Sequence, residues 1–188
     1  MKDFVINLVG PSGSGKTTIC KRFEKLGVNV VKSLTTRKPR YADEYGHTFI
    51  SGKWVYDNEL VGFSVDGGVF VPVSDIVSYL DAYGCTYLST KDQYIGKGLT
   101  INTVDSTGAE RTKKVLTKTK VITVYLMVGR EERMARMMKE MRTDVVHRLQ
   151  TDHEMFNLIK CDYVVDGERP VDEIVETIID LVGEYNVL

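Results

Sequence analysis

The sequence predicts a single α/β domain in which a central parallel sheet lies between two layers of helices. The first observation is an apolar run of strand type, Phe4–Val9, followed by a glycine-rich turn and then by helix formers up to Leu26. The second is a pair of later apolar runs, Leu99–Val104 and Val121–Val128, each followed by a helix-forming segment. Such alternation of strands and helices is typical of a parallel sheet covered on both faces.

The turn after the first strand, Gly10–Thr17, matches the phosphate-binding loop G-x-x-x-x-G-K-[ST]. Its glycines let the backbone curl so that successive N–H groups point at phosphate oxygens, and the following helix adds its dipole. We expect Lys16 to neutralise the β- and γ-phosphates of ATP and Thr17 to hold Mg²⁺. A P-loop NTPase fold is therefore predicted, with ATP-binding residues Gly10, Ser12, Gly13, Ser14, Gly15, Lys16, Thr17 and Thr18.

Length, charge and cysteine content narrow the protein class. A chain of 188 residues with net charge −1 suits one domain and has no overall basic field for non-specific nucleic-acid binding. Its three cysteines lack C-x-x-C spacing, which predicts free thiols in a reducing compartment. No apolar run reaches the length of a membrane span, and the first strand leaves no room for a signal peptide. We expect a cytoplasmic protein without a membrane partner.

A second apolar run, Val28–Val31, leads into Ser33-Leu-Thr-Thr-Arg-Lys-Pro-Arg40. Two arginines three residues apart, Arg37 and Arg40, can hold a doubly charged phosphate by paired N–H···O bonds. A P-loop followed at this distance by S-x-T-T-R-x-P-R resembles the guanylate kinase family of nucleoside monophosphate kinases. The resemblance implies ATP and Mg²⁺ as cofactors, base contact by Ser33, and binding of the acceptor phosphate by Arg37 and Arg40.

The resemblance also implies that residues 33–84 form a small, strand-rich nucleotide-binding insert. Alternating apolar residues over 61–65 and 69–73 flank Asp66-Gly67-Gly68, which predicts a hairpin. A helix is predicted for residues 74–84, which are amphipathic and begin with a serine cap. Residues 85–98 look like an extra loop relative to the family.

The resemblance is weakest at the residues that read the base, because guanylate kinases use a glutamate on the first strand of this hairpin. If the turn is at Gly67-Gly68, that position falls at Val61 or Gly62. If the turn is at Gly84, it falls at Ser78. Neither placement restores a carboxylate, so we expect weaker discrimination in favour of guanine.

The two placements also differ in the tyrosine that holds the acceptor phosphate in the family. It becomes Phe70 in the first placement and Tyr87 in the second, and a further family tyrosine is replaced by His47. Asp43 and Glu44 remain candidate acceptor-binding residues that could replace the missing glutamate.

Asp105 follows the strand Leu99–Val104 and opens a helix in Asp105-Ser-Thr-Gly-Ala109. The resemblance implies that this carboxylate lies near the bound base and the water shell of the metal. An ordinary helix N-cap is the alternative interpretation.

The resemblance implies that residues 129–148 form a helical lid whose arginines close over the ATP phosphates. Of its arginines, Arg136, Arg142 and Arg148 fit the catalytic positions best. The core then comprises residues 1–32, 99–128 and 149–188, ending in a strand at Cys161–Asp166 and an amphipathic helix at Val171–Val182.

These features together predict an ATP-dependent kinase that phosphorylates a nucleoside monophosphate, with a (d)GMP-like acceptor expected first. One alternative is a related kinase acting on another or a modified deoxynucleotide, free or within DNA, as in phage base modification. A non-catalytic guanylate-kinase-like binding module is the other, although such domains characteristically have degraded phosphate loops. DNA is a partner only under the first alternative, and the sequence leaves the oligomeric state open.

Overall fold

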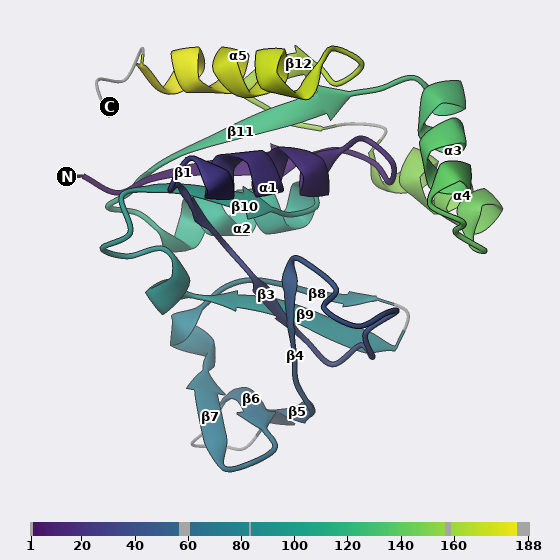
Figure 1. Ribbon diagram of the computed structural model, residues 1–188. Coiled ribbons are helices and arrows are strands. Elements are labelled where there is room, and N and C mark those ends of the chain that lie inside the picture. The colour runs from purple at the N-terminus through teal and green to yellow at the C-terminus, as the bar shows by residue number, and fades with distance from the viewer. Residues whose placement is uncertain (1, 57–60, 83, 157–158, 184–188) are drawn as a thin grey trace.

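The computed structural model describes residues 2–56, 61–82, 84–156 and 159–183. Its core is a parallel sheet in the order β12-β11-β1-β10-β2 (Figure 1). The central strand β1 pairs with β10 on one side and β11 on the other, and all of its residues are buried. The strands of this sheet are β1 (Phe4–Val9), β2 (Asn29–Val30), β10 (Leu99–Thr103), β11 (Lys120–Met127) and β12 (Tyr163–Asp166).

Helices cover both faces of the sheet. Helices α1 (Lys16–Lys25) and α5 (Val171–Gly183) bury Phe23 and Ile178 against the face that carries Ile6 of β1. Helix α2 (Ser106–Val115) lies on the opposite face (Figure 1). Successive β1 side chains point to opposite faces, so both helix layers are packed on the same apolar strand. The predicted three-layer α/β fold is confirmed.

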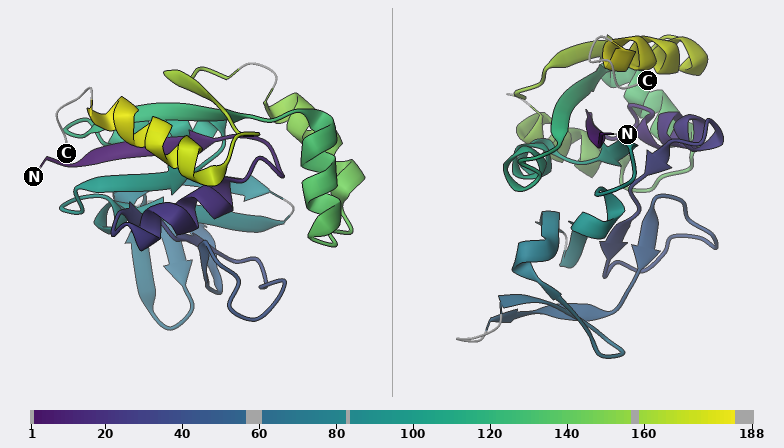
Figure 2. Two further views of the ribbon diagram at one scale, coloured as in Figure 1. Left: turned by 45° about the horizontal axis from the view of Figure 1, so that its top comes forward. Right: turned by 90° about the vertical axis from the view of Figure 1, so that its left-hand side faces the viewer.

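The insert contains two small sheets on one side of the core (Figures 1 and 2). Both are held by a common apolar cluster around Phe63, Ile76 and Leu88. The hairpin predicted at Gly67-Gly68 is the β6–β7 hairpin, with Val65 opposite Val69. The first sheet has the order β4-β3-β9-β8, and its strands are β3 (Ser33–Thr35), β4 (His47–Phe49), β8 (Ile76–Ala82) and β9 (Cys85–Thr90). The second contains β5 (Gly52–Tyr56), β6 (Val61–Val65) and β7 (Val69–Pro72).

The helix predicted for residues 74–84 is wrong. One short turn, η1 (Val73–Asp75), precedes strand β8, which pairs antiparallel with β9. The segment looks helical because Ile76 and Val77 are adjacent apolar residues. In the strand, Ile76 packs with Phe63 and Leu88, whereas Val77 packs in a separate cluster with Val5 and Tyr94. Long-range pairing therefore decides the structure against the local periodicity. Tyr83, which also suggested the helix, lies outside the described residues.

The extra loop predicted at residues 85–98 is also wrong, because the segment contributes β9 and a short turn, η2 (Lys91–Gln93). Tyr94 is fully buried and its hydroxyl lies 2.8 Å from Ser89 Oγ, so this segment belongs to the packed interior. The insert sheets accordingly extend to residue 90.

The lid segment forms two helices, α3 (Arg130–Lys139) and α4 (Val145–Met155), which project from the end of the sheet (Figure 1). Helix α4 runs past the expected lid boundary at residue 148. Of the lid methionines, Met137 is buried, whereas Met138 and Met141 are exposed. No helix in the described part of the chain is long and apolar enough to cross a membrane.

Candidate active site

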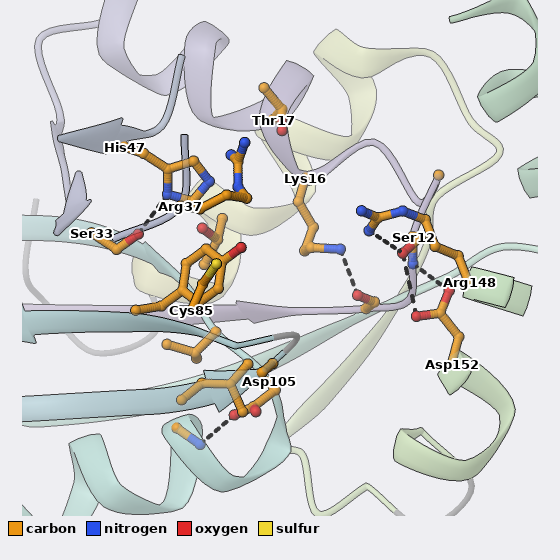
Figure 3. Close-up of a pocket in the computed structure, with 18 of the residues that line it drawn as sticks. Ser12, Lys16, Thr17, Ser33, Arg37, His47, Cys85, Asp105, Arg148 and Asp152 are labelled. Carbon is orange, nitrogen blue, oxygen red and sulfur yellow. Dashed lines mark hydrogen bonds between the residues drawn. The ribbon is translucent and has the colours of Figure 1, made fainter. Parts of the chain in front are cut away.

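A cavity of about 700 Å³ lies beyond the carboxyl ends of β1 and β10, between the core, the insert and the lid (Figure 3). Ligands of parallel α/β folds bind at this end of the strands. The predicted site residues that line it are Gly10, Ser12, Gly13, Gly15, Lys16, Thr17, Thr18, Ser33, Arg37, Arg40, Asp105, Arg142 and Arg148. The described residues that line it do not include Ser14, Asp43, Glu44 or Arg136.

The phosphate loop lies directly between β1 and the first turn of α1. Gly13 and Gly15 have φ values of 78° and 91°, a backbone conformation that favours glycine. A Cβ at Gly10 would lie 2.8 Å from Ser14 Oγ, so the loop closes on itself too tightly for a side chain there. The glycine positions of the motif are thus required by the backbone.

Lys16 lies inside this loop and donates to its carbonyl oxygens. The Nζ atom is 2.5 Å from Gly10 O and 2.9 Å from Pro11 O. Burial lowers the pKa of Lys16 to about 8, and the nearby negative charge of Asp152 opposes part of this shift. Lys16 is therefore mainly protonated at pH 7 and carries the positive charge that a phosphate needs.

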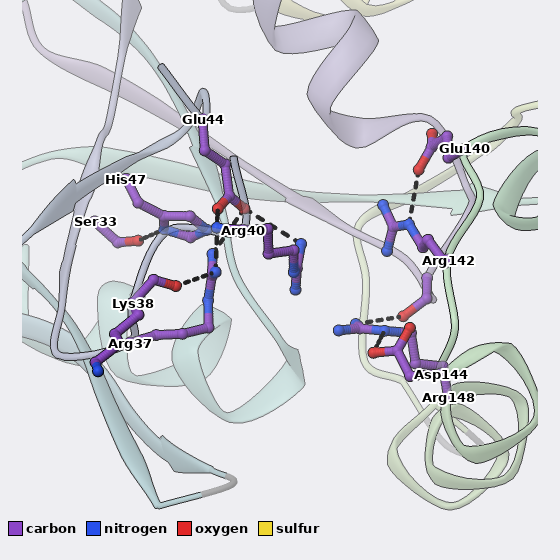
Figure 4. A network of polar contacts seen from close by, with 11 residues as sticks. Ser33, Arg37, Lys38, Arg40, Glu44, His47, Glu140, Arg142, Asp144 and Arg148 are labelled. Atoms are coloured by element: carbon purple, nitrogen blue, oxygen red, sulfur yellow. Dashed lines mark hydrogen bonds and ion pairs between the residues drawn. The ribbon is translucent and has the colours of Figure 1, made fainter. Parts of the chain in front are cut away.

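On the insert side of the cavity, Glu44 fixes the two arginines of the Ser33–Arg40 motif (Figure 4). Arg37 donates two bonds to Glu44, of 2.8 and 3.1 Å, and the Arg40 backbone N–H donates a third of 2.8 Å. Burial opposes ionisation of this carboxyl, but the bonds from Arg37 and Arg40 outweigh it and hold the pKa of Glu44 below its ordinary value. Glu44 thus positions the arginines instead of facing the cavity.

Asp43, the other candidate substitute for the missing glutamate, is exposed and has a φ of 56° in the turn before Glu44. Neither acidic residue is among the described residues that line the cavity. The sequence alone could not separate these roles, because the fold decides which way each side chain points.

Ser33 and His47 form a second polar contact on this wall. Ser33 Oγ lies 2.7 Å from His47 Nδ1. Burial, with a further contribution from Arg37, lowers the pKa of His47 to about 4, so its imidazole is neutral at pH 7. The pair can therefore offer hydrogen bonds to a ligand without adding charge.

One wall of the cavity is formed by the β8–β9 hairpin, which carries the candidates of the second placement. Ser78 and Tyr87 line the cavity, whereas Val61 and Phe70 are not among its described lining residues. Ser78 Oγ lies 2.7 Å from Ser89 Oγ, so hydroxyl groups face the cavity here beside the apolar Leu80 and Leu88. The sequence-based placement of the turn at Gly84 gave Ser78 and Tyr87 as the candidate base and phosphate contacts. The helix predicted for the same segment conflicts with that placement.

Asp105 caps a helix at the edge of the cavity, and its position near a bound base stays a prediction. It is the N-cap of α2, with Oδ1 accepting from Gly108 N–H at 2.6 Å, and it lines the cavity. Burial raises the pKa of this carboxyl above its ordinary value. Thr17 and Asp105 have oxygen atoms that could bind Mg²⁺. In proteins Mg²⁺ commonly takes only one or two such ligands from side chains, and substrate phosphates and water supply the others. Within the described stretches, no three His, Cys, Asp or Glu side chains form a cluster that could hold a metal without substrate.

The lid places two arginines opposite Arg37 and Arg40 (Figure 4). Arg142 Nε donates to Glu140 at 2.7 Å and Arg148 Nε to Asp144 at 2.6 Å. The third predicted lid arginine, Arg136, points elsewhere and donates to Gly167 O at 3.1 and 3.2 Å. Arg136 therefore lies beside the phosphate loop, with Nη1 3.5 Å from where a Cβ at Gly15 would be, and is not among the described residues that line the cavity.

Arg133 and Asp152 meet at the phosphate loop. The sequence placed Arg133 only among the lid arginines, behind Arg136, Arg142 and Arg148 as a catalytic candidate, and did not single out Asp152. Asp152 Oδ2 accepts from Ser12 N–H at 2.8 Å, and Arg133 lies 3.2 Å from the same carboxylate. They come from different helices and belong to no motif, so only the packing of the lid brings them together.

A glycine-rich anion loop and facing arginine pairs around one cavity define a P-loop kinase. No family model matches the chain. It is similar to the guanylate kinase of Thermotoga maritima, with 30% identity over 188 residues, covering 97% of this chain and 87% of the relative. The guanylate kinase of a Wolbachia from Brugia malayi is 29% identical over 180 residues, covering 89% and 87%. The chain therefore belongs to the guanylate kinase family.

Solved structures agree on the fold. A crystal structure of guanylate kinase from Anaplasma phagocytophilum has a TM-score of 0.58 at 18% identity and covers 98% of this chain and 87% of its own. Shikimate kinase from Acinetobacter baumannii has a TM-score of 0.51 at 16% identity and covers 100% and 97%. At these identities the likeness concerns the α/β fold alone.

Proposed function

We propose that the protein transfers the γ-phosphoryl group of ATP to a nucleoside monophosphate of the GMP or dGMP type. The observation that carries this proposal is a single cavity with an anion-binding loop between two arginine pairs. Arg37 and Arg40 line one wall and Arg142 and Arg148 the other. This arrangement suits two phosphorylated ligands with their phosphates facing each other. Kinship with guanylate kinases supports guanine as the acceptor base.

In the proposed reaction an oxygen of the acceptor phosphate attacks the γ-phosphorus, and the bond to the β–γ bridging oxygen breaks to release ADP. Lys16 and the lid arginines hold the negative charge that spreads over the transferred group, so no side-chain nucleophile is needed. Arg37 and Arg40 orient the acceptor. Mg²⁺, held by Thr17 and near Asp105, would neutralise charge on the β- and γ-oxygens.

The relationship to guanylate kinases does not favour the alternative acceptors, which are another or a modified deoxynucleotide, free or within DNA. It does not favour a non-catalytic binding module either. The three free cysteines support a cytoplasmic enzyme, and we keep this location as part of the proposal.

The test incubates the purified protein with ATP and Mg²⁺ and with each common nucleoside or deoxynucleoside monophosphate, or a DNA oligonucleotide, and measures ADP. ADP formation with GMP or dGMP supports the proposal. Formation with DNA alone, or with none of these acceptors, contradicts it.

A further inference from the structure

Ser12 of the phosphate loop is bound by both lid helices. Figure 3 shows its contacts with Asp152 and Arg148 of α4. Its N–H and hydroxyl donate to the carboxylate oxygens of Asp152 on α4, at 2.8 and 3.3 Å. Its carbonyl oxygen accepts from Arg133 on α3 at 3.4 Å. All three polar atoms of one loop residue are thus engaged by the lid, which couples the position of the loop to that of both helices.

The side chains that hold Ser12 form a buried ion pair. Arg133 and Asp152 are 3.2 Å apart, and their side chains are 11% and 9% exposed. The Arg133 Nε atom is buried and has no hydrogen-bond partner among the described residues. Replacing a buried ion pair by apolar side chains is often neutral or stabilising, so stability alone does not explain a pair at this position.

The backbone of α3 also closes on the loop at this point. A Cβ at Gly13 would lie 2.7 Å from Arg133 O, which leaves no space between helix and loop. The charges of Arg133 and Asp152 therefore lie beside the N–H groups and the Lys16 ammonium that attract phosphate. A nucleotide phosphate at the loop is repelled by Asp152 and attracted by Arg133, and the low dielectric of a buried site strengthens both effects.

We propose that Arg133 and Asp152 are positioning residues for ATP, which hold the phosphate loop against the lid and set the ATP affinity by opposing charges. This inference rests on the proposed function, in which the phosphate loop binds ATP. The single variants should then change ATP affinity in opposite directions. Asp152→Asn leaves Arg133 without its counter-charge and should tighten ATP binding, whereas Arg133→Met leaves Asp152 alone and should weaken it.

The experiment measures dissociation constants of ATP, ADP and GMP by calorimetry for the full chain, the two single variants and the double variant. We expect about a fivefold or larger change in Kd for ATP in each single variant, with opposite signs, a smaller change for ADP, and none for GMP. The double variant, which carries neither charge, should bind ATP within about twofold of the wild type.

The matched control is Asp162→Asn. Asp162 also accepts a backbone N–H, that of Thr123 at 2.6 Å, and pairs with Lys113 at 2.7 Å, but it does not line the cavity. Its variant should leave all three dissociation constants unchanged.

If Arg133 and Asp152 only stabilised the packing of the lid against the loop, both single variants would bind ATP more weakly, and this result would overturn the inference. If a single variant fails to fold, a large loss of ATP affinity in the double variant would also overturn it. Absence of ATP binding by the wild type would overturn the proposed function itself.

Discussion

At the scale of single residues, Lys16 carries the proposed chemistry. It is held by the carbonyl oxygens of its own loop, and its charge lies where the β- and γ-phosphates are expected. Lys16→Ala should lower kcat by about a thousandfold, as losses of single transition-state charge contacts do. The fold should survive, because the substitution removes a partly desolvated charge and leaves the apolar core unchanged. Turnover and thermal unfolding should be measured together, with exposed Lys97→Ala as the control. Near-normal turnover would refute the role of the loop.

The lowered pKa of Lys16 gives a pH dependence with a definite sign. The group is protonated below its pKa of about 8 and loses the phosphate-binding charge above it. We therefore expect kcat/KM for ATP, which reports the free enzyme, to fall by about tenfold per pH unit once the pH exceeds the pKa of Lys16. Lys16→Arg should remove the fall, because a guanidinium stays protonated. A wild-type profile that stays level through this range would exclude Lys16 as the titrating group.

Arg37 and Arg40 should affect the acceptor and not ATP. Replacing either with Lys should raise the KM for GMP and lower kcat, since an ammonium cannot form the two-pronged contact of a guanidinium. Arg37→Lys should also cost stability, because Arg37 pairs with the buried Glu44, whereas Arg40 is more exposed. Steady-state kinetics with each substrate varied in turn tests this, with Arg22→Lys as an exposed ion-pair control. A change confined to the KM for ATP would show that the motif serves the other substrate.

At the scale of secondary-structure elements, the phosphate loop, β1 and the β6–β7 hairpin were predictable because each has a strong local signal. Glycines in a fixed pattern and strict alternation around Gly67-Gly68 leave few other conformations. Strand β8 was not predictable from the local pattern, since Ile76 and Val77 are buried in two different apolar clusters that only the packing of the insert against the core creates. The Arg133–Asp152 contact was also beyond local patterns, because it depends on how α3 and α4 meet the loop.

The β8–β9 hairpin leads to a prediction about base selection. Ser78, the residue that the second placement gives for the family glutamate, lines the cavity and is hydrogen-bonded to Ser89. A hydroxyl contact contributes about 1–3 kcal/mol when buried, less than a carboxylate that accepts two guanine N–H groups. We expect kcat/KM to favour GMP over AMP, dTMP and dCMP by only about tenfold to a hundredfold. A preference above about ten-thousandfold would mean that another group, such as Asp105, reads the guanine edge.

At the scale of the whole molecule, the core, the insert and the lid each supply one part of the cavity, and the proposed reaction needs all three. The loop at β1 supplies the ATP site, Arg37 and Arg40 supply the acceptor site, and Arg142 and Arg148 face them from the lid. Closure of α3 and α4 would exclude water, which otherwise competes with the acceptor for the γ-phosphoryl group. The joint arrangement of the three parts therefore favours transfer to a nucleotide over loss of the phosphoryl group to water.

The most direct measurement follows the label from γ-labelled ATP when the purified protein is given GMP and Mg²⁺. The proposed reaction predicts that the label appears in the β-phosphate of GDP, that ADP and GDP form in equal amounts, and that Lys16→Ala forms neither. Release of the label as inorganic phosphate, or its retention in ATP, would contradict the assignment of this protein as a nucleoside monophosphate kinase acting on GMP.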